Sequence, residues 1–98
     1  MKNEIGTYVI VRSARAGVFA GEIAARNGQE IDMTNVRRIW YWDGAASLSQ
    51  LAMSGVSKPK NCKFSVVTAE HKIFEVIEII ACTTEARQSI ESVPVWVA

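Results

Sequence analysis

The chain has 98 residues, of which 49% are hydrophobic and 21% charged, values typical of a folded protein that exclude a disordered segment. This length fits one domain, residues 1–98, and leaves no room for a second domain with its own core. Eleven Lys and Arg residues against ten Asp and Glu residues give a formal net charge of +1. That balance excludes a protein that binds bulk nucleic acid through its overall positive charge.

The first residues, MKNEIGTY, include Glu4 and lack the apolar segment of a signal peptide. No run approaches the roughly twenty apolar residues that cross a bilayer, so a cytosolic protein is expected. Cys62 and Cys82 form no CxxC motif, and His71 is the single histidine, which argues against a zinc site within one protomer. Both cysteines are expected to be reduced thiols, with a disulfide as the alternative.

Three strands are predicted in the first half of the chain. Thr7–Ser13 is rich in β-branched and aromatic residues, and Gly17–Ala25 follows after a connection of small residues. Asn27-Gly28 then predicts a type I′ hairpin turn, because both residues tolerate positive φ. Glu30–Trp42 is predicted to return as a long strand beside the second.

The second half predicts two strands between two short helices. Helical spacing of apolar residues over Ala45–Ala52 predicts a helix capped by Asp43 and closed by Gly55. Strands are predicted at Cys62–Val67 and at Lys72–Cys82, a nearly continuous apolar run. Thr83 or Thr84 is predicted to cap the last helix, which Pro94 stops.

The apolar segment after that helix is expected to pack through Trp96 on the body of the protein or on a neighbouring protomer. The element order β-β-β-α-β-β-α predicts an α+β fold, with an antiparallel sheet of about five strands and two short helices that cover one side.

Groups suited to catalysis are sparse. His71 lies between Glu70 and Lys72 in a predicted polar turn, where an exposed histidine without a role is favoured over a general base. The sequence has no GxSxG, P-loop, GxGxxG or HExxH motif. We therefore expect a non-enzymatic protein without a metal or cofactor.

Groups suited to binding are concentrated in Arg37–Gly44, where two arginines and three aromatic residues lie on a predicted strand. Alternation places Arg38, Trp40 and Trp42 on one face and Arg37, Ile39 and Tyr41 on the other. The first face could stack a base and bind a phosphate. The alternative is that Trp40 and Trp42 belong to the core, with the arginines at its rim.

A second candidate segment runs from Arg12 to Gly21. Arg12 and Arg15 flank a connection of small residues, and Gly17 and Gly21 bracket Phe19, so that a ligand could approach the backbone and stack on the ring. An ordinary turn with solvated arginines is the alternative.

Four segments together resemble a family of short proteins encoded by tailed bacteriophages and prophages: Tyr8–Arg12, Ala16–Gly21, Arg37–Ala52 and Glu78–Thr83. The resemblance covers nearly the whole chain, and the stretch RRIWYWDGAASL is its most specific part. It implies a phage protein that acts in the host bacterial cytoplasm or is a minor virion component. In size, in a sheet with two helices, and in its arginine and aromatic residues, the chain is also similar to phage anti-defence sponges of the Thoeris and CBASS type.

The similarity to sponges implies a homo-oligomer that binds and sequesters a cyclic nucleotide or cyclic ADP-ribose type signal. The expected ligand-binding residues are Arg12, Arg15, Arg37 and Arg38 for phosphates, with Phe19, Trp40 or Trp42 for the base. The alternative is a phage structural or host-protein interaction protein, in which Ile73–Ala81 and Val95–Val97 form an interface. An enzyme that degrades a nucleotide signal is a third hypothesis.

Overall fold

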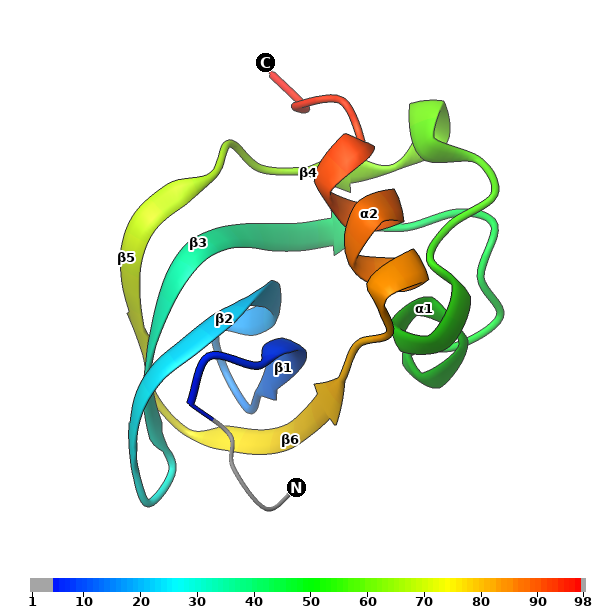
Figure 1. Ribbon diagram of the computed structural model, residues 1–98. Coiled ribbons are helices and arrows are strands. Elements are labelled where there is room, and N and C mark those ends of the chain that lie inside the picture. The colour runs from blue at the N-terminus through cyan, green and yellow to red at the C-terminus, as the bar shows by residue number, and fades with distance from the viewer. Residues whose placement is uncertain (1–4, 98) are drawn as a thin grey trace.

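The computed structural model describes residues 5–97 and has an α+β fold, which confirms the predicted class (Figure 1). The sheet has six strands, one more than the sequence predicts. The elements in chain order are β1 (Tyr8–Ser13), β2 (Gly17–Asn27), β3 (Glu30–Tyr41), α1 (Leu48–Ser54), a 3-10 turn (Pro59–Asn61), β4 (Lys63–Phe64), β5 (Thr68–Ile73), β6 (Val76–Ala81) and α2 (Thr84–Ser92).

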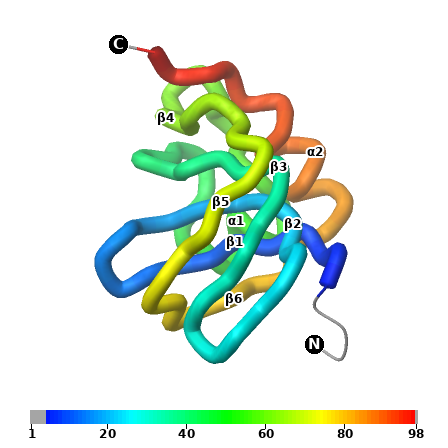
Figure 2. Tube along the Cα trace, turned by 90° about the vertical axis from the view of Figure 1, so that its left-hand side faces the viewer, coloured from blue at the N-terminus to red at the C-terminus, as the bar shows by residue number. Residues whose placement is uncertain are grey.

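The sheet is an antiparallel meander that curls on itself. Its strand order is β4-β3-β2-β1-β6, and β5 pairs with the first half of β3 while β4 pairs with the end of β3. β5 and β6 lie at opposite sides of this order but are joined by the short turn at Phe74 and Glu75, so the strands curve around a common centre (Figures 1 and 2). The Ser13 hydroxyl donates to the carbonyl of Phe74 at 2.7 Å and holds this turn beside the end of β1.

Both faces of the curled sheet are buried at residues 8–11 of β1, which explains why these four residues form an apolar run. Tyr8 and Ile10 point outward to the two helices, whereas Val9 and Val11 point into the curl. The outer core comprises Tyr8, Ile10, Ala20, Ile39, Leu51, Ala52, Cys62, Phe64, Ile90 and Val93. The inner core comprises Val9, Val11, Phe19, Ile23, Ile31, Met33, Val36, Ile73 and Val76.

The predicted hairpin between β2 and β3 is confirmed, but its turn differs. Asn27 pairs with Glu30 as the last residue of β2, so the two turn residues are Gly28 and Gln29. Gly28 has φ 60°, and Asn27 is not among the residues with positive φ. The turn therefore has the glycine-first pattern of type II′ rather than type I′, because the strand pairing extends one residue further than predicted.

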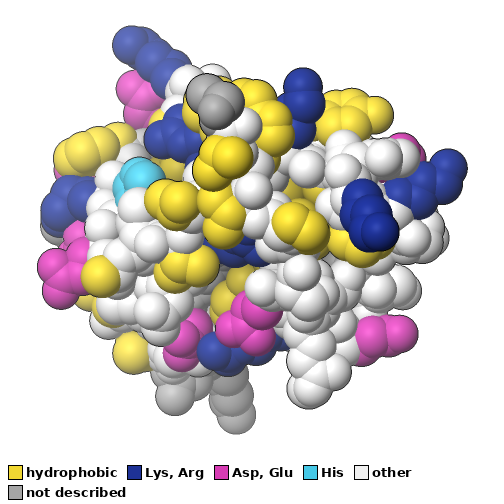
Figure 3. Space-filling model, turned by 90° about the horizontal axis from the view of Figure 1, so that it is seen from above, with side chains coloured by type: hydrophobic (Ala, Val, Ile, Leu, Met, Phe, Trp, Pro, Cys, Tyr) yellow, Lys and Arg dark blue, Asp and Glu magenta, His cyan; other side chains and the backbone are white. Residues whose placement is uncertain are grey.

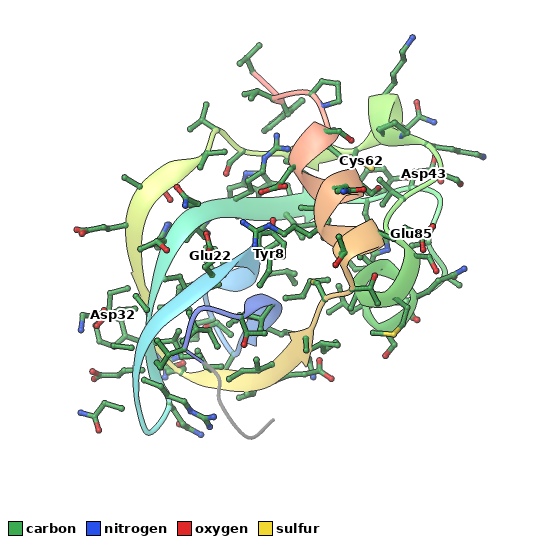
Figure 4. The ribbon with its side chains drawn as sticks, viewed as in Figure 1. Tyr8, Glu22, Asp32, Asp43, Cys62 and Glu85 are labelled. Atoms are coloured by element: carbon green, nitrogen blue, oxygen red, sulfur yellow. The ribbon has the colours of Figure 1, made fainter. Side chains whose placement is uncertain are left out.

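The first helix begins later than predicted. Ser47 is its N-cap and accepts from the Gln50 amide at 3.2 Å. Asp43, the predicted cap, instead accepts from the Asn61 side chain at 3.0 Å, and its backbone lies beside Cys62 (Figure 4). Gly55 ends the helix with φ 76°, as predicted.

The region after α1 differs most from the prediction. The strand predicted at Cys62–Val67 is only the two residues of β4, and β5 was not predicted at all. The apolar run Lys72–Cys82 is divided between β5 and β6 by a turn in which Glu75 has φ 55°. A continuous apolar run cannot reveal this break, because both new strands remain apolar on their buried faces.

The last helix agrees with the prediction, whereas Trp96 of the tail, which was expected to pack, is 47% exposed. The Thr83 hydroxyl accepts from the Ala86 amide at 3.0 Å and caps α2. Beyond the helix, Val95 forms a parallel bridge with Phe64, and the Trp96 amide donates to the Phe64 carbonyl at 2.9 Å. The tail therefore extends the sheet beside β4.

Candidate functional site

The candidate site depends on how β3 separates two consecutive arginines. Because side chains alternate along a strand, Arg37 points outward to α2 and Arg38 points to the inner side, opposite Phe19 of β2. The sequence predicts this separation, and the structure confirms it. The two guanidinium groups consequently have different surroundings and different roles.

Arg37 is a structural residue. Its side chain is 3% exposed, and its Nη1 donates to the carbonyls of Ile90 at 2.8 Å and Val93 at 2.7 Å, while Nε donates to the carbonyl of Ser65 at 2.9 Å. A cation that donates to the last carbonyls of a helix offsets their partial negative charge. Burial lowers the pKa of Arg37 from its ordinary value. Arg37 therefore secures α2 on the sheet and lies away from the predicted phosphate-binding face.

Arg38 is held in place by two aromatic rings. Its Cζ lies 4.6 Å from the centre of the Phe19 ring and 5.1 Å from that of Trp40, both within the range of a cation–π interaction. Nη1 also donates to the carbonyl of Ala16 at 2.9 Å. These contacts fix the guanidinium group, so a ligand would lose little side-chain entropy on binding it.

Trp40 is 60% exposed. After the fixed guanidinium group of Arg38, this exposure is the second indication that a ligand binds on this side of β3. One part of its indole ring contacts Arg38, and the remainder is available for stacking. Phe19, in contrast, is fully buried, so its ring packs against Arg38 but is not accessible to a ligand. Of the two aromatic groups that the structure brings to Arg38, Trp40 alone can contact a ligand.

A cavity of about 220 Å³ lies beside Arg38 and is lined by residues of β1, β2, β3 and β5 and of the turns that follow β1 and β5. Arg15, Arg38 and Lys72 contribute positive charge, although Lys72 is paired with Asp32 at 3.1 Å, and Glu75 contributes one negative charge. Arg15 pairs with Glu75 at 3.2 Å, but both side chains are exposed, and such a pair is weak. The cavity therefore favours an anion.

His71 is a lining residue that the sequence interpretation missed. It lies on β5 rather than in a turn, with its ring 5.1 Å from that of Phe19 in an edge-on contact. The Thr68 hydroxyl is 3.1 Å from its Nδ1 atom. Burial, and then the charge of Arg38, lower the pKa of His71, which favours the neutral ring at pH 7. Only recognition of β5 would have revealed this residue.

Two more of the predicted ligand residues lie elsewhere. Arg12 points to the outer side of β1 and pairs with Glu78 of β6 at 2.9 Å. Trp42 follows the end of β3 and packs against the outer core, so it does not continue the face of Arg38 and Trp40. The reason is that the strand ends at Tyr41, and the pairing of β3 with β4 shifts register between Ile39 and Tyr41.

The structure thus joins Arg15, Phe19, Arg38, Trp40 and His71 into one group, here called the Arg38 cluster, and separates it from Arg12, Arg37 and Trp42. A larger cavity of about 480 Å³ lies over β2, β3 and β5. Its charged lining residues are Asp32, Glu70 and Lys72, and Lys72 is paired with Asp32 at 3.1 Å. Because two of these three side chains are negatively charged, the larger cavity is a poorer candidate for binding an anion.

Within residues 5–97, no group of three or more His, Cys, Asp or Glu side chains is placed to hold a metal ion. Both cysteines are free thiols. Neither α-helix of the described chain has the length and apolar character needed to cross a bilayer.

Comparison with known proteins gives a family but no described relative. No curated protein and no solved structure matches the chain. A family model described as Domain of unknown function (DUF6948) matches residues 6–90, a range that includes the whole Arg38 cluster. The chain belongs to the DUF6948 family.

Proposed function

We propose that the protein is a non-catalytic binding protein that takes a nucleotide-like ligand at the Arg38 cluster. The observation that supports this most is the guanidinium group of Arg38, which is fixed on two rings beside a positively lined cavity. A phosphate would bind the free edge of Arg38 and be attracted by Arg15 and Lys72. A base would stack on the exposed part of Trp40.

The size of the cavity limits the part of the ligand that enters it. About 220 Å³ is below the range of drug-sized pockets, so it suits one phosphate and its sugar rather than a whole cyclic dinucleotide. The rest of such a ligand would extend over Trp40 or contact a second protomer. An oligomer is therefore part of the proposal.

The resemblance to phage proteins supports a more specific form of the proposal. In that form, the protein acts in the cytoplasm of an infected bacterium and sequesters a cyclic nucleotide or cyclic ADP-ribose type immune signal. Sequestration needs binding without turnover, in keeping with a site built of arginine and aromatic groups rather than a nucleophile and base.

Calorimetric titration tests the proposal with cyclic ADP-ribose isomers and with cyclic di- and trinucleotides. We expect Trp40→Ala to weaken binding by about 1–3 kcal/mol, the usual loss of one stacked base. Trp96→Ala is the matched control, because Trp96 is also exposed, at 47%, but lies on the tail beside β4. Absence of heat with every ligand at tens of micromolar protein, or equal losses in both variants, would refute the proposal.

A protein-interaction function is the second candidate, because apolar side chains gather around β4 and the tail. Tyr41, Val66, Val67, Val95, Trp96 and Val97 are all exposed by 45% or more. Figure 3 looks onto this end of the molecule and shows hydrophobic side chains grouped on it. The strand β6, the other predicted interface, is an edge strand with Ile77 half exposed. A stoichiometric protein partner recovered from infected cells, without a nucleotide, would favour this function.

A further inference from the structure

The outer side of β3 holds a buried positive charge that no carboxylate of the described chain neutralises. Arg37 is 3% exposed, and its hydrogen bonds go only to backbone carbonyls, those of Ser65, Ile90 and Val93. Its remaining nitrogen, Nη2, is buried and has no hydrogen-bond partner. Buried charges in proteins are normally paired, and a buried N–H without an acceptor is rare, so this atom calls for an explanation.

Arg37 also borders a cavity. The space has a volume of about 250 Å³ and is lined by Tyr8, Asn35, Arg37, Val67 and Glu91; we call it the Arg37 cavity. Asn35, Val67 and Glu91 are exposed and form its rim, whereas Tyr8 and Arg37 are buried and form its interior. The cavity lies on the opposite side of β3 from the Arg38 cluster. Figure 3 looks onto the end of the molecule that carries the tail. It shows basic atoms recessed between hydrophobic and acidic side chains on this end.

Tyr8 provides a second donor. Its ring lies beneath the guanidinium group of Arg87, 4.8 Å from the ring centre, and it stands opposite Glu22 across β1 and β2 (Figure 4). Burial, and then the negative charge of Glu91, raise the pKa of Tyr8. The phenol therefore stays protonated and can donate a hydrogen bond, and its hydroxyl makes none within residues 5–97.

The acidic residues near the cavity are already engaged. Arg87 pairs with Glu91 at 3.3 Å and with Glu22 at 3.5 Å. Neither carboxylate reaches Arg37, but the negative charge of Glu91 at the rim would repel a dianion such as phosphate. A singly charged oxyanion is the better match to one guanidinium group and one phenol.

We propose that the Arg37 cavity binds the carboxylate group of a small monocarboxylic acid, one oxygen accepting from Nη2 of Arg37 and one from the hydroxyl of Tyr8. Val67 provides an apolar wall for a short carbon chain, and the volume suits an acid of a few carbon atoms. The site is separate from the proposed nucleotide site, so either can fail without the other.

Side-chain ¹⁵N NMR during a titration with sodium acetate and sodium propionate tests the site, with sodium phosphate and sodium chloride at matched ionic strength for comparison. We expect saturable shifts of the Arg37 guanidinium signals with both carboxylates and weaker ones with phosphate. Arg12 serves as an internal control, because its guanidinium group is paired with Glu78 of β6 and belongs to neither proposed site. Equal shifts of Arg12 and Arg37, or no saturable shift of Arg37, would overturn the proposal.

Tyr8→Phe removes the proposed donor and keeps the ring beneath Arg87. It should weaken acetate binding about tenfold, the usual effect of one lost hydrogen bond to a charged group. Tyr41→Phe removes an exposed hydroxyl that is not part of the cavity and should leave the affinity unchanged. Equal acetate affinity in the native protein and Tyr8→Phe would overturn the role given to Tyr8.

Discussion

Replacing each of the two adjacent arginines of β3 by methionine separates a structural guanidinium group from a binding one. Arg37→Met removes the guanidinium donor from the carbonyls of Ser65, Ile90 and Val93, of which, within residues 5–97, only that of Ile90 keeps another donor, the backbone amide of Val93 at 3.3 Å. A buried acceptor without a partner lowers the free energy of unfolding by about 1–3 kcal/mol. The variant also no longer buries a charged group, and this gain offsets part of the loss. We expect Arg37→Met to lower the free energy of unfolding by about 3 kcal/mol, a large share of the 5–15 kcal/mol typical of a domain.

Arg38→Met is the matched control. It removes one hydrogen bond, to the carbonyl of Ala16, from a half-buried side chain, while a methionine can still pack on the two rings. The expected cost is about 1 kcal/mol. Urea denaturation followed by tryptophan fluorescence measures both values, provided that the free energy of unfolding falls with urea concentration at the same slope in both variants and the native protein. Equal costs for the two variants, or a larger cost for Arg38→Met, would refute the assignment of Arg37 to the end of α2.

Three further predictions concern packing and titration. Gly55→Ala should destabilise the protein more than Gly28→Ala in thermal unfolding. A Cβ at Gly55 would lie 2.2 Å from the Cβ of Ser89 on α2, whereas a Cβ at Gly28 would meet no atom within 4 Å. Equal shifts of the melting temperature would contradict the close approach of the two helices. Because the pKa of His71 is lowered on folding, the unfolded chain takes up its proton first as the pH falls below about 6.5, so stability should fall there; His71→Gln should lose this pH dependence. Partial burial raises the pKa of Cys82 to about 11, so Cys82 should react with a thiol reagent at pH 8 much more slowly in the native protein than in the unfolded chain, and equal rates would contradict the raised pKa.

The alternation of β3 is the part of the site that can be predicted from the sequence. A strand repeats every two residues, so Arg37 and Arg38 must point to opposite sides wherever the strand lies. Which side is covered by a helix depends on contacts far apart in the sequence, such as that of Arg37 with Val93. The sequence interpretation therefore assigned both arginines to ligands, although one is part of the fold.

The strand β5 was the main omission, and it hid His71. Its residues Thr68–Ile73 are mostly polar, because only one face of this strand packs on the inner core. A short polar segment beside an apolar run resembles a turn followed by a strand. The pairing of β5 with β3, which brings His71 opposite Met33, is a long-range contact that no local pattern encodes.

The most direct test of the Arg38 cluster is the response of the three tryptophan indole signals to ligand in a ¹H–¹⁵N NMR spectrum. Cyclic ADP-ribose and cyclic di-AMP are suitable first ligands. We predict a saturable shift of the Trp40 indole with contacts to the base protons, and little change at Trp42, which packs on the outer core, or at Trp96 on the tail. A shift confined to Trp96, or none at millimolar ligand, would contradict the proposed site.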